Sequence, residues 1–121
     1  MNNLDGTVTD KKTGLMWQKG DSGDTPLTCD QANAYCPGLD LDGYTDWRLP
    51  EIEALLTVVD YTRFNPALSM IFDPYRSNFY WSSSTYAPDP TGAWNVYFGN
   101  GEVHSSIKTN GGYVRCVRGG P

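Results

Sequence analysis

Residues 43–60 constrain the fold of this chain more than any other stretch, because a proline separates an extended corner from an amphipathic segment. Pro50 fixes its own φ angle and pushes Leu49 toward an extended conformation, so a helix cannot begin before this point. Beyond Pro50, apolar residues recur at the i, i+3, i+4 and i+7 spacing of one helical face. They are Ile52, Leu55, Leu56 and Val59. This spacing predicts a helix across residues 51–60 with one buried side.

The length and charge of the chain limit its architecture and its partners. A chain of 121 residues has the size of one domain, so we expect residues 1–121 to form a single domain with its own core. The formal net charge is −5 and no basic run occurs, which argues against nucleic acid as a partner. No stretch approaches the ~20 apolar residues that span a bilayer, so we expect no direct membrane insertion.

Local signals elsewhere predict an α+β domain that is rich in loops. A hairpin is predicted at residues 5–19, where β-prone residues flank a polar turn. Thr28 and Gln31 have the spacing of a capping box, which predicts a helix from Cys29 to Cys36. Residues 61–79 have no sustained period and are predicted to form a long packed loop.

The C-terminal half has the pattern of a block of antiparallel strands. The stretch from Phe98 to Glu102, with its Gly-Asn-Gly centre, is the clearest hairpin signal in the chain. Two helices followed by antiparallel strands are typical of an α+β domain with short sheets. The strands are predicted at residues 80–83, 93–98, 102–106 and 113–118.

Five motifs, in order along the chain, resemble the pattern of one bacterial domain family. The motifs are Asp5-Gly6-Thr7-Val8-Thr9-Asp10, Thr13-Gly14-Leu15-Met16-Trp17-Gln18, Gly43-Tyr44-Thr45-Asp46-Trp47-Arg48-Leu49-Pro50, Tyr80-Trp81-Ser82-Ser83-Ser84 and Tyr113-Val114-Arg115-Cys116-Val117-Arg118. Together they resemble the family typified by the C-terminal domain of the Legionella collagen-like adhesin. The resemblance implies a C-type-lectin-like fold, a bacterial secreted or cell-surface setting, and a non-enzymatic binding or adhesion role in which some members recognise glycans.

The N-terminal residues carry no signal peptide. Because the family pattern begins close to Asp5, we expect the chain to be one domain of a longer exported precursor, with Met1 marking the start of an excised segment. The ligand expected from the resemblance is a glycan or a protein on a host or neighbouring cell.

Three cysteines allow one disulfide and one free thiol. Cys29 and Cys36 on one helix would be ~10 Å apart at ~1.5 Å per residue, beyond the ~7 Å limit for a disulfide. Cys116 must therefore pair with one of them. The resemblance selects Cys36, which matches the family position that joins the first helix to the last strand, and this leaves Cys29 free.

The β-rich half also has the composition of a binding site. Flat aromatic rings stack on the apolar faces of sugars, while amide and hydroxyl groups take their hydroxyls. We therefore predict a glycan or protein site in the loops of residues 80–112. The candidate ligand-binding residues are Tyr86, Trp94, Asn95, Tyr97 and Asn100. For Trp94 and Trp81 the competing interpretation is a place in the core, and Trp17 and Trp47 are assigned to the core.

No metal site or cofactor is expected. Asp40, Asp42 and Asp46 have a spacing that suggests a calcium loop, but the twelve-residue EF-hand pattern is absent and a solvated loop is favoured. Calcium-dependent sugar-binding lectins carry Trp-Asn-Asp, whereas this chain has Trp94-Asn95-Val96. The family's adhesin recognises sulfated glycans through a basic surface. In this acidic chain, that specificity would require convergence of Lys11, Lys12, Lys108, Arg115 and Arg118.

Three other interpretations were weighed. One is a structural or oligomerising head, such as a homotrimer at the end of a fibrous stalk. Another is an enzyme of the formylglycine-generating type, which shares the broader fold and needs a reactive cysteine pair that a Cys36–Cys116 bridge would consume. The third is a catalytic pair of Cys29 and His104, which matches cysteine-histidine catalysis only in residue type, so a buried and inert Cys29 is favoured. We therefore expect no catalytic residues.

Overall fold

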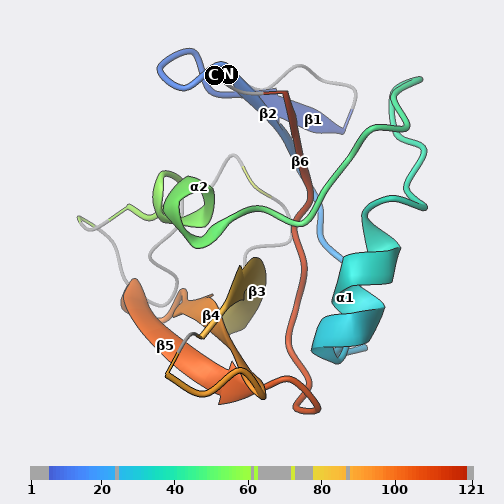
Figure 1. The fold of residues 1–121 in the computed structure, drawn as a ribbon. Coiled ribbons are helices and arrows are strands. Elements are labelled where there is room, and N and C mark those ends of the chain that lie inside the picture. The colour runs from blue at the N-terminus through green and yellow to red at the C-terminus, as the bar shows by residue number, and fades with distance from the viewer. Residues whose placement is uncertain are drawn as a thin grey trace.

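In the part of the chain that the computed structural model describes, two three-stranded antiparallel sheets and two short helices form an α+β fold (Figure 1). The structure describes residues 6–23, 25–60, 62, 72, 78–86 and 88–119. The elements are β1 (Thr7–Thr9), β2 (Leu15–Gln18), α1 (Cys29–Tyr35), α2 (Ile52–Leu56), β3 (Phe79–Thr85), β4 (Gly92–Tyr97), β5 (Glu102–Ile107) and β6 (Val117–Gly119).

The first sheet joins the two ends of the described chain. Its order is β1-β2-β6, so the first and last strands flank β2. Trp17 in β2 pairs with Val8 on one side and with Val117 on the other. The predicted N-terminal hairpin is confirmed.

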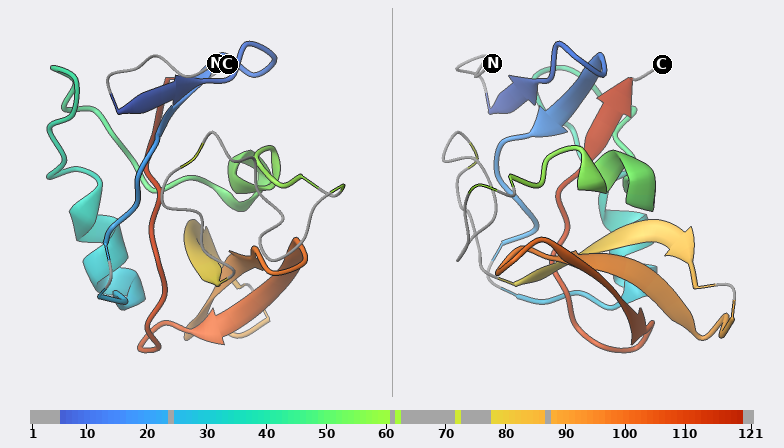
Figure 2. Two further views of the ribbon diagram at one scale, coloured as in Figure 1. Left: turned by 180° about the vertical axis from the view of Figure 1, so that it is seen from behind. Right: turned by 90° about the vertical axis from the view of Figure 1, so that its left-hand side faces the viewer.

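The last strand is shorter than predicted, because the segment before it connects the two sheets. Tyr113 accepts a hydrogen bond from the Trp81 N–H (2.9 Å), next to β3. Three residues later, the Cys116 carbonyl accepts from the Gln18 N–H (2.9 Å) in β2. A segment that changes partners in this way cannot form one continuous ladder. Figures 1 and 2 show it running between α1 and α2 toward β6.

The second sheet has the order β3-β4-β5 and lies in the C-terminal half, as predicted. The hairpin between β4 and β5 is confirmed, and its turn closes with a hydrogen bond from the Gly101 N–H to the Tyr97 carbonyl (2.8 Å). Gly101 has φ of +83°, a backbone conformation that glycine adopts without a steric penalty.

Helix α1 begins where its capping box predicts. The Gln31 N–H donates to Thr28 Oγ1 (3.3 Å), and the Thr28 N–H donates to Gln31 Oε1 (2.9 Å). These bonds satisfy two backbone donors that the first turn of a helix leaves unpaired. The helix ends at Tyr35, just before Pro37.

Helix α2 is only five residues long, so the prediction of a helix across residues 51–60 is wrong in length. After Leu56 the chain tightens into turns, in which the N–H groups of Thr57 and Val58 bond to carbonyls three residues back. The adjacent β-branched residues Val58 and Val59 do not favour continuation of the helix. The predicted apolar face is correct, since Leu55 is 1% exposed and Ile52 packs against the same cluster.

The described residues form two buried apolar clusters. The first lies between the two sheets and α2, and comprises Val8, Leu15, Trp17, Leu55, Phe72, Tyr80, Val96, Phe98 and Val117. The second lies beside α1, and comprises Cys29, Ala32, Cys36, Trp47, Leu49, Trp81, Ala93, Val114 and Cys116. The core assignment of Trp17, Trp47 and Trp81 is therefore confirmed. The loop predicted at residues 61–79 falls mostly outside the described residues.

The disulfide predicted from the resemblance is present. Cys36 and Cys116 are joined with an S–S distance of 2.08 Å and a Cα–Cα distance of 5.6 Å. The bond connects the end of α1 to the segment that crosses between the sheets. Cys29 is free and buried.

Candidate functional site

The two faces of the second sheet have different environments. Tyr80 and Val96 are cross-strand partners and belong to the first cluster, where Leu55 of α2 packs against them. On the opposite face, Trp81 and Ala93 belong to the second cluster beside α1. The remainder of that opposite face carries a depression.

This depression, which we call the β4–β5 site, has a volume of about 390 Å3. Its side chains come from neighbouring positions on three strands. Tyr97 pairs with Phe79 of β3 and Glu102 of β5, and Asn95 pairs with His104 of β5. Directly paired residues point to the same side of a sheet, which brings these groups together. The lining residues are Phe79, Asn95, Tyr97, Glu102, His104, Ser105 and Ser106.

The polar side chains of the β4–β5 site contact one another. Asn95 is 1% exposed, and its Nδ2 donates to Ser106 Oγ at 2.9 Å. Glu102 Oε1 and His104 Nε2 are 3.3 Å apart at a position where both side chains are more than half exposed. The His104 ring also meets the Tyr97 ring edge-on, with centroids 6.5 Å apart. The site therefore presents an aromatic ring, a carboxylate and an imidazole to solvent above a buried amide.

Two of the five residues predicted from the sequence line this site, namely Asn95 and Tyr97. Trp94 follows the alternation of β4 and points to the other face, where its ring packs edge-on against Tyr86 with centroids 4.7 Å apart. Tyr86 is only partly exposed, although the sequence suggested a free loop contact. Asn100 lies in the β4–β5 turn, and its Oδ1 accepts from the Glu102 N–H (3.0 Å).

The candidate ligand-binding residues chosen from the sequence did not include Phe79, Glu102, His104, Ser105 or Ser106. A signal for two of them was available in the predicted hairpin. A turn centred on residues 99–101 pairs Tyr97 with Glu102 and Asn95 with His104, so the register implies that these side chains are neighbours. The contribution of Phe79 depends on the pairing of β3 with β4, which is not visible in a local pattern.

A family model described as the Lcl C-terminal domain matches residues 6–118. The chain belongs to the Lcl C-terminal domain family. A comparison with curated proteins gave no significant match. The match spans both sheets and both helices, and it makes the chain an adhesin-related domain. No helix in the described ranges is long and apolar enough to cross a membrane.

Three of the basic residues named for a sulfated-glycan surface, Arg115, Arg118 and Lys108, have separate partners in this Lcl C-terminal domain. Arg115 is 2% exposed, and its Nη1 donates to the carbonyls of Gln18 (3.3 Å), Lys19 and Gly20 (2.6 Å). Its guanidinium also lies 4.7 Å from the centre of the Phe72 ring. Arg115 is therefore an interior residue that holds the chain after β2, and it cannot join a surface patch for sulfated glycans.

Arg118 and Lys108 have separate partners. Arg118 Nε donates to Asp46 Oδ1 at 2.6 Å, and this hydrogen bond lowers the pKa of the Asp46 carboxyl. Lys108 Nζ donates to Thr85 Oγ1 at 3.1 Å. The convergence of basic side chains that a sulfated-glycan site would require is not observed for these residues.

The aspartate loop does not assemble a set of metal ligands. Asp46 is engaged by Arg118, and the loop between Leu41 and Tyr44 is closed by their mutual backbone hydrogen bonds (3.1 Å each). In the part of the chain that the structure describes, no group of three or more His, Cys, Asp or Glu side chains is arranged to hold a metal ion.

Cys29 and His104 lie in different environments. Cys29 is 3% exposed in the second cluster, and burial raises the pKa of its thiol. His104 is exposed on β5 beside Glu102 and Tyr97. Asn33 Nδ2 lies 3.6 Å from the Cys29 sulfur, and the Cys29 N–H donates to the Lys108 carbonyl (2.8 Å). The disulfide takes the other two cysteines, which leaves one buried thiol in the sequence.

Proposed function

We propose that this domain is a non-enzymatic adhesion module that binds a glycan through the β4–β5 site. The observation that supports the proposal is the shared location of Tyr97, Asn95, Glu102 and His104 in one depression. A partly exposed tyrosine ring beside hydrogen-bonding groups matches what a sugar offers, which is an apolar face bordered by hydroxyls. Membership of an adhesin-related family supports the same role.

The charge of the site favours a neutral glycan. Among the described residues that line it, Glu102 is the one carboxylate, and none is a lysine or an arginine. A sulfate group would meet the Glu102 carboxylate without a fixed cation to offset the repulsion. Neutral hexoses and amino sugars are therefore better ligands for this site than sulfated polymers.

The proposal includes the finer structural and cellular expectations. We infer a C-type-lectin-like fold, which is supported by the pairing of the first and last strands around β2 and by the disulfide from α1 to the C-terminal segment. We also infer display on, or secretion from, a bacterial cell as part of a longer protein, an inference that rests on the family.

The test is a glycan array with neutral, sialylated and sulfated sugars, probed at low and moderate salt. Binding to neutral sugars should weaken about fivefold in Tyr97→Ala, the cost of one aromatic contact. His104→Ala should weaken it as well. Asn95→Ala is a poor probe because Asn95 is buried and its loss would disturb the sheet.

Tyr44→Ala is the matched control, since Tyr44 is an exposed tyrosine outside the site. It should bind as the unaltered protein does. Equal losses in Tyr44→Ala and Tyr97→Ala would disprove the location of the site. Tight, salt-sensitive binding to sulfated sugars alone would disprove the charge argument, because screening weakens only charge-driven binding.

A second function is favoured by one observation. Within the described residues β5 is the outer strand of its sheet, and it exposes Val103 (39%) and Ile107 (57%). An open strand edge with exposed apolar side chains can pair with another chain. We propose homo-oligomerisation along β5, including a trimer, as the alternative role. Light scattering on the unaltered protein and on Ile107→Glu tests it, and a monomer at every concentration would exclude it.

A further inference from the structure

The charge of the β4–β5 site is one-sided. Glu102 belongs to its lining, and the Glu102 side chain is 61% exposed. The carboxylate contacts His104, whose Nε2 lies 3.3 Å away and which is positively charged only when protonated. Among the described residues that line the site, none is a lysine or an arginine. The Glu102 carboxylate therefore borders the depression without a fixed positive charge beside it.

The Tyr97 ring lies on the same face of the sheet as this carboxylate. Tyr97 and Glu102 are directly paired between β4 and β5, so their side chains are neighbours. Gly99 in the turn leaves room for the ring, since a Cβ at that position would overlap the Tyr97 ring atoms. A carboxylate attracts a cation through its charge, and an aromatic ring adds to the attraction when the cation reaches its face. This pair of side chains is therefore suited to an ammonium group.

The remaining polar side chains suit the hydroxyls of a sugar. Glu102, His104 and Ser106 follow one another on one face of β5, because alternate residues of a strand share a face. Ser106 Oγ accepts from Asn95 Nδ2 (2.9 Å), and its own hydroxyl hydrogen can still be donated. A sugar whose amine lies at Glu102 can direct its hydroxyls toward His104 and Ser106.

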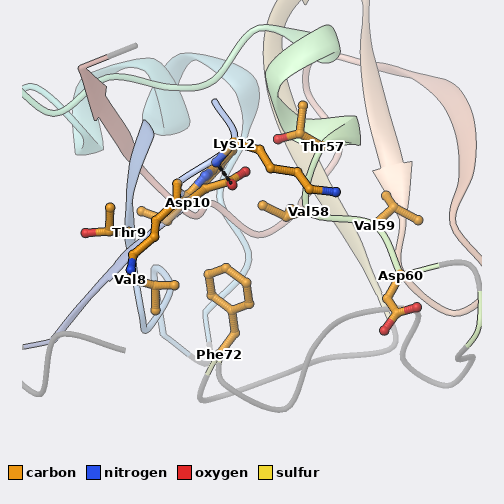
Figure 3. A pocket seen from close by; sticks show the side chains of 11 residues that line it. Val8, Thr9, Asp10, Lys12, Thr57, Val58, Val59, Asp60 and Phe72 are labelled. Atoms are coloured by element: carbon orange, nitrogen blue, oxygen red, sulfur yellow. Dashed lines mark hydrogen bonds between the residues drawn. The ribbon is translucent and has the colours of Figure 1, made fainter. Parts of the chain in front are cut away.

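A larger cavity elsewhere in the molecule has a different charge. It has a volume of about 510 Å3 and lies between the β1–β2 turn and the chain that follows α2 (Figure 3). Its lining combines Lys11 and Lys12 with the carboxylates of Asp10 and Asp60. Figure 3 shows the Lys12 side chain extending toward Thr57. Two cations offset two anions there, so a cationic ligand is expected at the β4–β5 site rather than in this cavity.

We propose that the β4–β5 site selects sugars with a free, protonated amine over the same sugars in N-acetylated or hydroxyl form. The ammonium group lies between the Glu102 carboxylate and the Tyr97 ring. N-acetylation removes the positive charge, so the acetylated sugar loses the attraction to Glu102. The inference rests on the proposed glycan-binding role, and it makes Glu102 the residue that determines specificity.

The test compares three methyl β-glucosides that differ only at C6, where they carry a hydroxyl, an amine or an acetamide. Titrations at about pH 8 keep a primary amine protonated, whereas free histidine is neutral there. Binding is followed by the backbone amide resonances of His104 and Ser106 in 1H–15N spectra. The amino sugar should bind about fivefold more tightly than the other two, as expected for one exposed charge pair with a ring contact.

Two matched variants locate the preference. Glu102→Gln should reduce the ratio of amine to hydroxyl affinity to about one. Glu53→Gln makes the same change on α2, outside the site, and should keep the ratio.

The outcomes separate this inference from the role on which it rests. Equal binding of the amino and hydroxyl sugars by the unaltered protein would overturn the inference and leave the glycan-binding role standing. A ratio that survives in Glu102→Gln, or is lost in Glu53→Gln, would overturn it as well. Unmoved His104 and Ser106 resonances with all three sugars would refute both.

Discussion

Removing the Cys36–Cys116 bridge should destabilise the domain more than any other change of two side chains. The bond spans 80 residues of sequence and includes most of the chain in its loop. In the chain-entropy model, closing such a loop lowers the entropy of the unfolded chain by about 15 cal/mol/K, or ~4.5 kcal/mol near room temperature. A domain of this length has a total stability of roughly 6–18 kcal/mol. The bridge therefore contributes a large share of the free energy of unfolding.

The experiment compares the unaltered protein with Cys36→Ala/Cys116→Ala in urea denaturation at 25 °C and in thermal melts. The variant should lose ~4 kcal/mol and melt about 15–20 °C lower. Its m-value should rise, because an unfolded chain without the bridge exposes more surface. Dithiothreitol should lower the stability of the unaltered protein toward that of the variant once the bond is reduced.

Cys29→Ala is the matched control, since Cys29 is buried in the same apolar cluster as the bridge but forms no disulfide. It should cost only about 1 kcal/mol for the small void that the sulfur leaves. The loop-closure reasoning is refuted if the double variant loses no more stability than twice the Cys29→Ala value, with an unchanged m-value. Cavity formation alone would then account for the result.

Two further changes test the interior cation and the surface ion pair. Arg115→Met should lower the free energy of unfolding in urea by at least about 3 kcal/mol, because it removes the Nη1 donor of the carbonyls of residues 18–20, at the end of β2 and just after it. Arg118→Met, on the partly exposed last strand, is the control and should cost much less. A loss no larger than that of Arg118→Met would show that solvent satisfies those carbonyls. The second change concerns pH. The Asp46 pKa is lowered in the folded state by Arg118, so the pair stabilises the protein above the usual aspartate pKa and this contribution is lost as pH falls through the folded pKa. A carboxyl-carbon NMR titration should place the Asp46 midpoint below the ordinary value and return it toward that value in Arg118→Ala, and an unchanged midpoint in the variant would contradict this attribution.

The helices and turns whose sequence signal lies within a few neighbouring residues were the ones that could be predicted. The capping box at Thr28 determines the start of α1, and the glycine turn around residue 101 determines the β4–β5 hairpin. Each is encoded within a few neighbouring residues, so its signal can be read directly. The length of α2 could not be read in the same way, because the apolar face of residues 52–59 continues past the point at which the chain leaves the helix.

The candidate site was predicted in part for a related reason. Composition indicated the β-rich half, and Asn95 and Tyr97 line the depression that forms there. Trp94 was grouped with them because it is their neighbour in sequence, but adjacent residues in a strand point to opposite faces. Which face of the second sheet is open depends on where α2 packs. That packing is a contact between segments far apart in the sequence, so no local pattern reveals it.

The sequence by itself determined the α+β class, the family pattern and the positions of several turns, because these depend on local conformational preferences and on residue order. Tertiary structure alone decided that the segment of residues 113–116 connects the two sheets, that Arg115 lies inside, and that Tyr97, Glu102 and His104 line one depression. These features depend on contacts between residues far apart in the chain, and the free energy of such contacts is set by burial and hydrogen bonding in the folded state rather than by any short pattern.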